Sequence, residues 1–254
     1  MKAKNIFSIV FLFLTFLVLC SGCGTDVKSK MSTTYIFVDV TDSTATDNIL
    51  TESQIDEIVD KMGFLKGSNN FNLYNGGEVK FFSIDDISQT LAKQPEKINN
   101  ENADFFNATP ELQRQEIIDE FTIKLKNSAK EFKTNAKFGR NKSEIYRNLC
   151  SALKELSKQS SDIKNVIIYS DMIENSTAFK LINSIEDSKI NSTIEKASQI
   201  CEMPDLSEIS IYVIPPLRSS NQSQIEQAKK FWKRLFEIKK AKNLVEFNVN
   251  LNIK

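Results

Sequence analysis

Histidine is absent from this sequence of 254 residues, and its absence excludes several kinds of active site. Without imidazole the chain has no Ser-His or Cys-His nucleophile pair, no histidine general base and no histidine metal ligand. Glycine is also scarce, with seven residues, and no glycine-rich phosphate-binding loop is present. The 33 basic and 33 acidic residues give no net charge of the kind that attracts nucleic acid. Nucleic acid is therefore not expected as a partner.

The first 22 residues read as a signal peptide. Two lysines precede an almost uninterrupted apolar run from residue 6 to residue 19. As a helix this run spans about 21 Å, which is short of a hydrocarbon core of roughly 30 Å. The segment LVLCSGCG then resembles a bacterial lipobox, with small residues directly before Cys23. We expect acylation at Cys23 in preference to Cys20, and a plain secretory signal is the alternative.

The predicted domain organisation follows from this N-terminus. Residues 1–22 would be the lipoprotein signal peptide, 23–33 a lipidated polar tether and 34–254 one folded domain. The acyl anchor would hold the protein on a membrane of the bacterial cell envelope, at the outer membrane or the cell surface. That location permits a disulfide between Cys150 and Cys201. Cys150 lies within an apolar helical pattern, however, so we expect a small buried side chain there.

Strands and helices alternate along the domain. The apolar patterns predict strands at 35–40, 78–84, 165–170 and 209–214, and an alternating edge strand at 245–251. They predict helices at 52–65, 109–132, 145–156, 177–201 and 222–240, and leave 85–107 weakly patterned. This alternation predicts an α/β fold, a three-layer, doubly wound and mostly parallel sheet flanked by helices. Ligands bind such sheets at the carboxyl ends of the strands.

Polar side chains gather at those strand ends. Asp39, Thr41 and Ser43 follow the first strand, Ser143 precedes a helix, and Asp171 follows a buried strand. Because the carboxyl ends of parallel strands meet at one edge, we expect these five residues to converge. Their carboxylate and hydroxyl oxygens suit a hard cation, Mg²⁺ or Mn²⁺. The sequence therefore predicts a divalent-cation site made of oxygen ligands.

In this order the motifs resemble the von Willebrand factor A family and its metal-ion-dependent adhesion site. That site combines D-x-S-x-S after the first strand, a threonine before a central helix and an aspartate after the fourth strand. Here DVTDS, KSEI and YSDM stand in those places, with Thr41 for the first serine and Ser143 for the threonine.

The resemblance also implies roles for the residues and a function. Thr41 and Ser43 would bind the ion directly, Ser143 would join them in some states, and Asp39 and Asp171 would act through water. A partner macromolecule would supply a carboxylate to an open coordination position. The implied function is metal-assisted binding without catalysis.

Two other functions stay open. YIFVDVTDS also resembles the haloacid-dehalogenase phosphotransferases, in which a strand ends in D-x-D-x-T. Asp39 would then be the nucleophile of a Mg²⁺-dependent phosphohydrolase, although Thr41 stands where the general acid belongs. The remaining alternative is a metal-free structural module of the envelope, in which these residues only cap a helix and close a loop.

Overall fold

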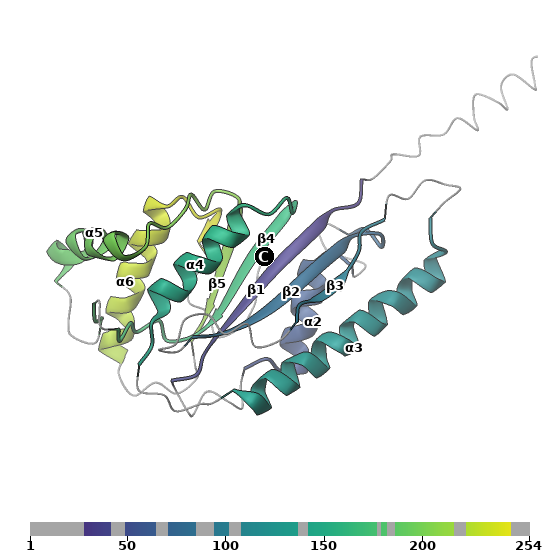
Figure 1. Ribbon diagram of the computed structural model, residues 1–254, viewed down its shortest axis with the longest axis horizontal. Helices are drawn as coiled ribbons and strands as arrows, with labels where there is room; N and C mark the ends of the chain where they lie inside the picture. The colour runs from purple at the N-terminus through teal and green to yellow at the C-terminus, as the bar shows by residue number, and fades with distance from the viewer. Residues whose placement is uncertain are drawn as a thin grey trace, which may run out of the picture.

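The computed structural model describes residues 28–41, 49–64, 71–84, 94–101, 108–136, 142–176, 179–181, 186–215 and 222–244. Within these ranges one six-stranded sheet has the order β3-β2-β1-β4-β5-β6 (Figure 1). Its strands are β1 (Met31–Asp39), β2 (Gly76–Ile84), β3 (Glu96–Ile98), β4 (Ile163–Tyr169), β5 (Ile209–Ile214) and β6 (Asn243–Leu244). Of the strand pairs described, β2 with β3 is antiparallel and the others are parallel. The predicted mostly parallel α/β sheet is confirmed.

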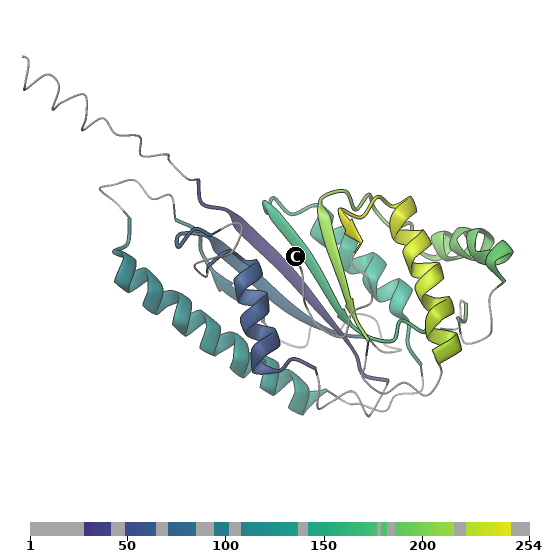
Figure 2. The same ribbon diagram turned by 180° about the vertical axis from the view of Figure 1, so that it is seen from behind.

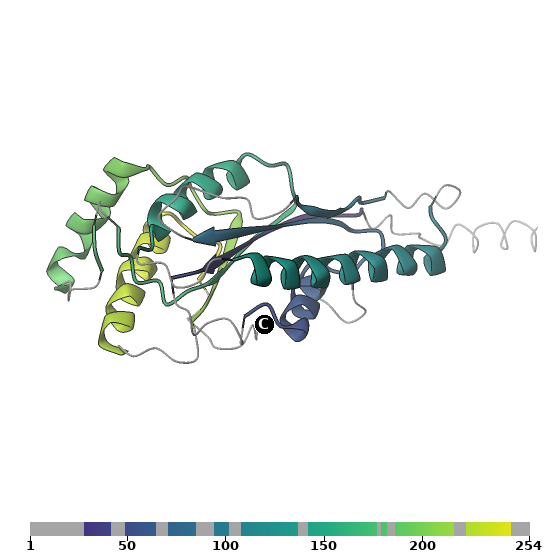
Figure 3. The same ribbon diagram turned by 60° about the horizontal axis from the view of Figure 1, so that its bottom comes forward.

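Helices cover both faces of the sheet. They are α2 (Glu52–Lys61), α3 (Glu111–Asn135), α4 (Ile145–Ser157), α5 (Ile190–Ile200) and α6 (Gln222–Ile238), with a short 3₁₀ helix η2 (Asp187–Lys189). One hydrophobic cluster joins α2 and α3 to the sheet, and a second joins α4, α5 and α6 to the other face. Figure 2 shows α2 and α3 over their face, and Figure 3 shows α4 on the opposite side of the strands from α3. The layers match the predicted three-layer architecture.

The strand β1 shows why the apolar runs in the sequence are continuous. Tyr35 and Phe37 pack with the α4 side, whereas Ile36 and Val38 pack with the α2 and α3 side. All four side chains are buried, because successive residues of a strand point to opposite faces and both faces are covered.

The boundaries of α2 follow from its caps. A capping box begins the helix, since Thr51 Oγ1 accepts the Gln54 N–H and Gln54 Oε1 accepts the Thr51 N–H. The helix ends at Lys61, earlier than the predicted residue 65. Gly63 has a φ of 82°, which only glycine adopts readily, and this left-handed residue ends the helix.

Other elements also differ between the prediction and the structure. The first strand begins at Met31, within the expected tether. The helix predicted over 177–201 begins at Ile190, because Lys180 forms a bridge with Asn175 before it. The antiparallel strand β3 was not predicted, since three residues are too few to form a pattern. The edge strand expected at 245–251 lies outside the described residues.

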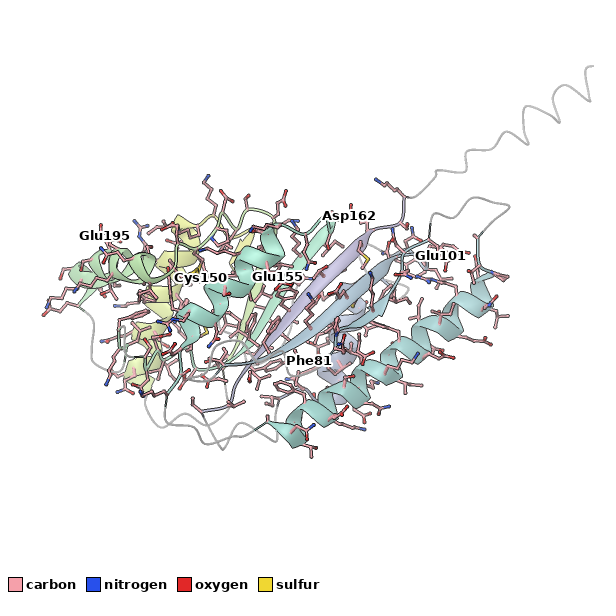
Figure 4. The ribbon with its side chains drawn as sticks, viewed as in Figure 1. Phe81, Glu101, Cys150, Glu155, Asp162 and Glu195 are labelled. Carbon is pink, nitrogen blue, oxygen red and sulfur yellow. A yellow bond between two sulfur atoms is a disulfide. The ribbon has the colours of Figure 1, made fainter. Side chains whose placement is uncertain are left out.

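Cys150 and Cys201 form a disulfide, which corrects the expectation of a small buried side chain. The bond joins α4 to the residue after α5, with 6.3 Å between the Cα atoms. Figure 4 labels Cys150 on α4. A separation of 51 residues contains no information about pairing, so only the fold reveals it.

No helix in the described ranges is long and apolar enough to cross a bilayer. The expected signal peptide, with Cys20 and Cys23, lies outside those ranges.

Candidate metal centre

The candidate centre lies where β1 and β4 end. Asp39 is the last residue of β1, and Ser170 directly follows β4. Val38 pairs with Tyr169 in the parallel register, so Asp39 and Ser170 are neighbours at the same edge. These two strands are adjacent in the sheet but separated in the chain by β2 and β3. This is the switch point at which ligands bind to doubly wound sheets.

Hydroxyl groups from three segments converge on the carboxylate of Asp39. Thr41 donates its backbone N–H to Oδ1 at 3.0 Å and its hydroxyl to the same oxygen at 2.6 Å. Ser143, two residues before α4, donates its hydroxyl to Oδ2 at 3.1 Å. Ser170 donates to Oδ2 at 2.8 Å. Both carboxylate oxygens therefore orient hydroxyl groups.

The Asp39 carboxylate is buried and has no cationic partner among the described residues. Its residue is 5% exposed, and in the described part of the chain no lysine or arginine forms an ion pair with it. Burial raises the pKa of Asp39, and the hydrogen bonds from Thr41, Ser170 and Ser143 oppose that rise. A buried charge is costly unless it is paired or coordinates a metal. Such a carboxylate is neutralised either by a proton or by a bound cation.

Two of the hydroxyl oxygens have the chemistry of hard-cation ligands. Thr41 Oγ1 and Ser143 Oγ use their hydrogens on Asp39, and within the described residues neither oxygen accepts a hydrogen bond. With respect to the described residues, their lone pairs are available to coordinate an ion. Ser170 Oγ, in contrast, accepts the Met172 N–H at 2.9 Å. Ser170 is therefore better suited to orienting Asp39 than to binding the ion.

The other two predicted ligands are Asp171, which the structure describes, and Ser43, which it does not. Asp171 follows Ser170 at the same edge of the sheet, and its Oδ1 accepts the Ile173 N–H at 2.9 Å. Ser43 lies outside the described residues. In the ranges described, no three His, Cys, Asp or Glu side chains are grouped to hold a metal. A cation here would depend on hydroxyls together with Asp39 and Asp171.

Sequence reasoning missed two residues around this centre. Ser170 was visible in YSDM but was not assigned a role. Glu174 looked like a loop residue, yet it is 1% exposed and its carboxylate accepts the Tyr146 N–H in the first turn of α4 at 2.8 Å. Burial raises the pKa of Glu174 to about 7. The burial of Glu174 and its raised pKa result from the packing of its loop against α4.

The raised pKa of Glu174 predicts a pH-dependent stability. The folded protein holds this proton more tightly than the unfolded chain, so the free energy of unfolding falls as pH rises through the window from the ordinary glutamate pKa to about 7. The expected loss is about 3 kcal/mol, and it levels off above that window. Glu174→Gln removes this contribution. Urea unfolding in a chelator between about pH 4.5 and about pH 7.5 measures it.

The matched control is Glu120→Gln, because Glu120 is an exposed glutamate on α3. This variant is expected to keep the wild-type profile. A Glu174→Gln profile that is parallel to the wild-type profile would contradict the prediction.

Comparison with known proteins does not identify a family. No protein-family model matches the chain, and no curated protein sequence matches it. Among solved structures it is similar to the human COPII-coat protein Sec24c, with 12% identity over 85% of this chain and a TM-score of 0.40. The chain spans 33% of the length of that structure.

Two further similar structures have comparable scores. An aerotolerance-related membrane protein from Bacteroides fragilis matches 80% of this chain and 88% of its own, with 11% identity and a TM-score of 0.33. Manganese-loaded Plasmodium vivax TRAP protein matches 80% of this chain and 63% of its own, with 11% identity and a TM-score of 0.36. At these scores the similarity assigns no function to the chain.

Proposed function

We propose that this chain is a cell-envelope lipoprotein with a von Willebrand A-like domain that binds a partner macromolecule through a divalent cation, Mg²⁺ or Mn²⁺. One observation carries the proposal. At the switch point of a doubly wound sheet, the buried Asp39 carboxylate orients hydroxyls, and among the described residues it has no cationic partner and the hydroxyl oxygens of Thr41 and Ser143 accept no hydrogen bond.

The residues divide into two roles. Thr41 and Ser143 hold the ion through hydroxyl oxygens, together with Ser43, while Asp171 contributes a carboxylate directly or through water. Asp39 and Ser170 orient the hydroxyls and balance charge. A bound divalent cation would supply a positive charge that attracts a carboxylate of the partner. We assign no catalytic step, because Thr41 donates its hydroxyl to Asp39 and provides no acid for phosphoryl transfer.

The proposed lipid anchor and the candidate site would lie at opposite ends of β1. The expected tether leads into β1 at Met31, and Asp39 is at the other end of the same strand. Eight residue steps of about 3.3 Å separate these positions by about 26 Å. The disulfide between Cys150 and Cys201 is typical of proteins outside the reducing cytoplasm, which favours the envelope location.

Titration of MnCl₂ and MgCl₂ into the purified protein tests the proposal by calorimetry and thermal unfolding. We expect saturable binding of one ion, and stabilisation by about 2.7 kcal/mol at 100 times the Kd. Ser143→Ala should weaken binding by about 10- to 100-fold. Ser157→Ala is the matched control, because Ser157 ends the same helix and donates only to the Lys154 carbonyl. Its affinity should equal that of the wild type.

Other outcomes would favour the alternatives. The absence of both binding and stabilisation in millimolar metal would support the metal-free module. Mg²⁺-dependent hydrolysis of a phosphate monoester that disappears in Asp39→Asn would support the phosphohydrolase.

A further inference from the structure

The first turn of α4 has no capping side chain of its own. Its N-cap residue, Glu144, makes no capping hydrogen bond and instead forms an ion pair with Arg147. Ser143 directs its hydroxyl to Asp39. The free N–H groups of a first helical turn need an acceptor when they are buried. That acceptor must therefore come from elsewhere in the chain.

Glu174 provides it from 28 residues further along. Its buried carboxylate accepts the Tyr146 N–H at 2.8 Å. A negative group at the N-terminus of a helix is stabilised by the free N–H groups and the helix dipole. The neighbouring residue strengthens the link, since Asn175 donates its N–H to the Ser143 carbonyl at 3.0 Å. The loop after β4 thus holds α4 immediately after Ser143.

Hydrogen bonds also restrain the backbone between Ser170 and Glu174. Met172 has a φ of 62°, which is unusual for a side chain of this size, and its N–H bonds to Ser170 Oγ. Its carbonyl accepts the Trp232 indole N–H at 2.8 Å. Backbone strain of this kind persists only where surrounding contacts enforce it. Glu174 therefore lies at a defined position relative to Ser170 and Asp171.

We propose that Glu174 is a positioning residue of the cation site, whose carboxylate holds the start of α4 so that Ser143 faces Asp39 and the Asp171 loop. This inference rests on the proposed function. Figure 1 shows the arrangement it requires, with the first turn of α4 and the carboxyl ends of β1 and β4 at one end of the sheet. Removing the carboxylate would free the start of α4 and separate Ser143 from the other ligands.

Calorimetric titration of MnCl₂ into the full chain and its variants tests this role. Glu174→Ala is expected to raise the Kd by about 10- to 100-fold. Glu174→Gln, whose amide oxygen still accepts an N–H, should restore the Kd to within about 10-fold of wild type. The control is Leu156→Ala, because Leu156 is buried at the far end of α4. That variant should lower Tm but leave the Kd within about twofold of wild type.

A second readout does not depend on metal. In the metal-free protein, amide hydrogen exchange at Tyr146 should be faster in Glu174→Ala than in wild type and unchanged in Glu174→Gln. A wild-type Kd in Glu174→Ala would overturn the inference and leave the proposed function standing. If Leu156→Ala raises the Kd as much as Glu174→Ala does, the effect of Glu174 is only on the stability of the fold, which would also overturn the inference. If the wild-type protein binds no Mn²⁺, both the proposed function and this inference fail.

Discussion

Asp39→Asn is expected to weaken Mn²⁺ binding by at least about 100-fold, the upper end of the effect found for residues that orient metal ligands. The substitution keeps the size of the side chain but replaces one acceptor oxygen with an NH₂ group. Ser143 and Ser170 both donate to one carboxylate oxygen, and Thr41 donates twice to the other. One of these sets loses its acceptor whichever way the amide is oriented. The negative charge that attracts the cation is lost as well. Calorimetric titration measures the change.

The control for this variant is Asp162→Asn. Asp162 accepts the Met31 N–H at 2.8 Å, at the end of the sheet where β1 begins, and Figure 4 labels it there. It also holds backbone beside β1, but far from the candidate centre, so its variant should bind Mn²⁺ as the wild type does. Circular dichroism should show that both variants are folded. Tight binding in folded Asp39→Asn would rule out the role given to Asp39.

Loss of the disulfide is expected to lower the free energy of unfolding by about 4 kcal/mol in the chain-entropy model, because the bond closes a loop of 51 residues. The double variant Cys150→Ala, Cys201→Ala should show this loss in urea unfolding. Wild-type protein in a thiol reductant should show a similar loss, since reduction removes the same constraint.

A reductant should leave the stability of the double variant unchanged, which separates the effect of the disulfide from that of the reagent. An oxidised wild-type protein no more stable than the double variant would contradict the prediction. The bond ties α4 to the end of α5, so the same experiment asks whether this restraint also affects Mn²⁺ affinity.

The elements that the sequence predicts well are those with long apolar patterns. The buried strand ISIYVI has the predicted bounds, and the apolar positions of α4 are all buried. The antiparallel β3 and the late start of α5 could not be predicted, because β3 has three residues and because Asn175, in the polar segment before α5, forms bridges with both Lys180 and the distant Ser143. Local patterns carry no information about such contacts.

The residues of the candidate site likewise include some that the sequence predicts and some that it does not. Asp39, Thr41 and Ser143 could be predicted to meet, because parallel strands bring their carboxyl ends to one edge. The role of Glu174 could not be predicted, because its burial depends on the packing of a polar loop against a helix start 28 residues earlier. Arg114 is a similar case, since this buried side chain bonds to backbone carbonyls of two loops and to Glu101. A sequence pattern would assign such an arginine to the surface.

The most direct test of the central claim is a crystal structure of the protein in saturating MnCl₂, with anomalous scattering collected to locate the manganese. The proposal predicts an ion within coordination distance of Thr41 Oγ1 and Ser143 Oγ, with Asp39 still accepting their hydroxyl hydrogens. An anomalous map with no manganese at this edge of the sheet, in crystals whose solvent contains the metal, would contradict it.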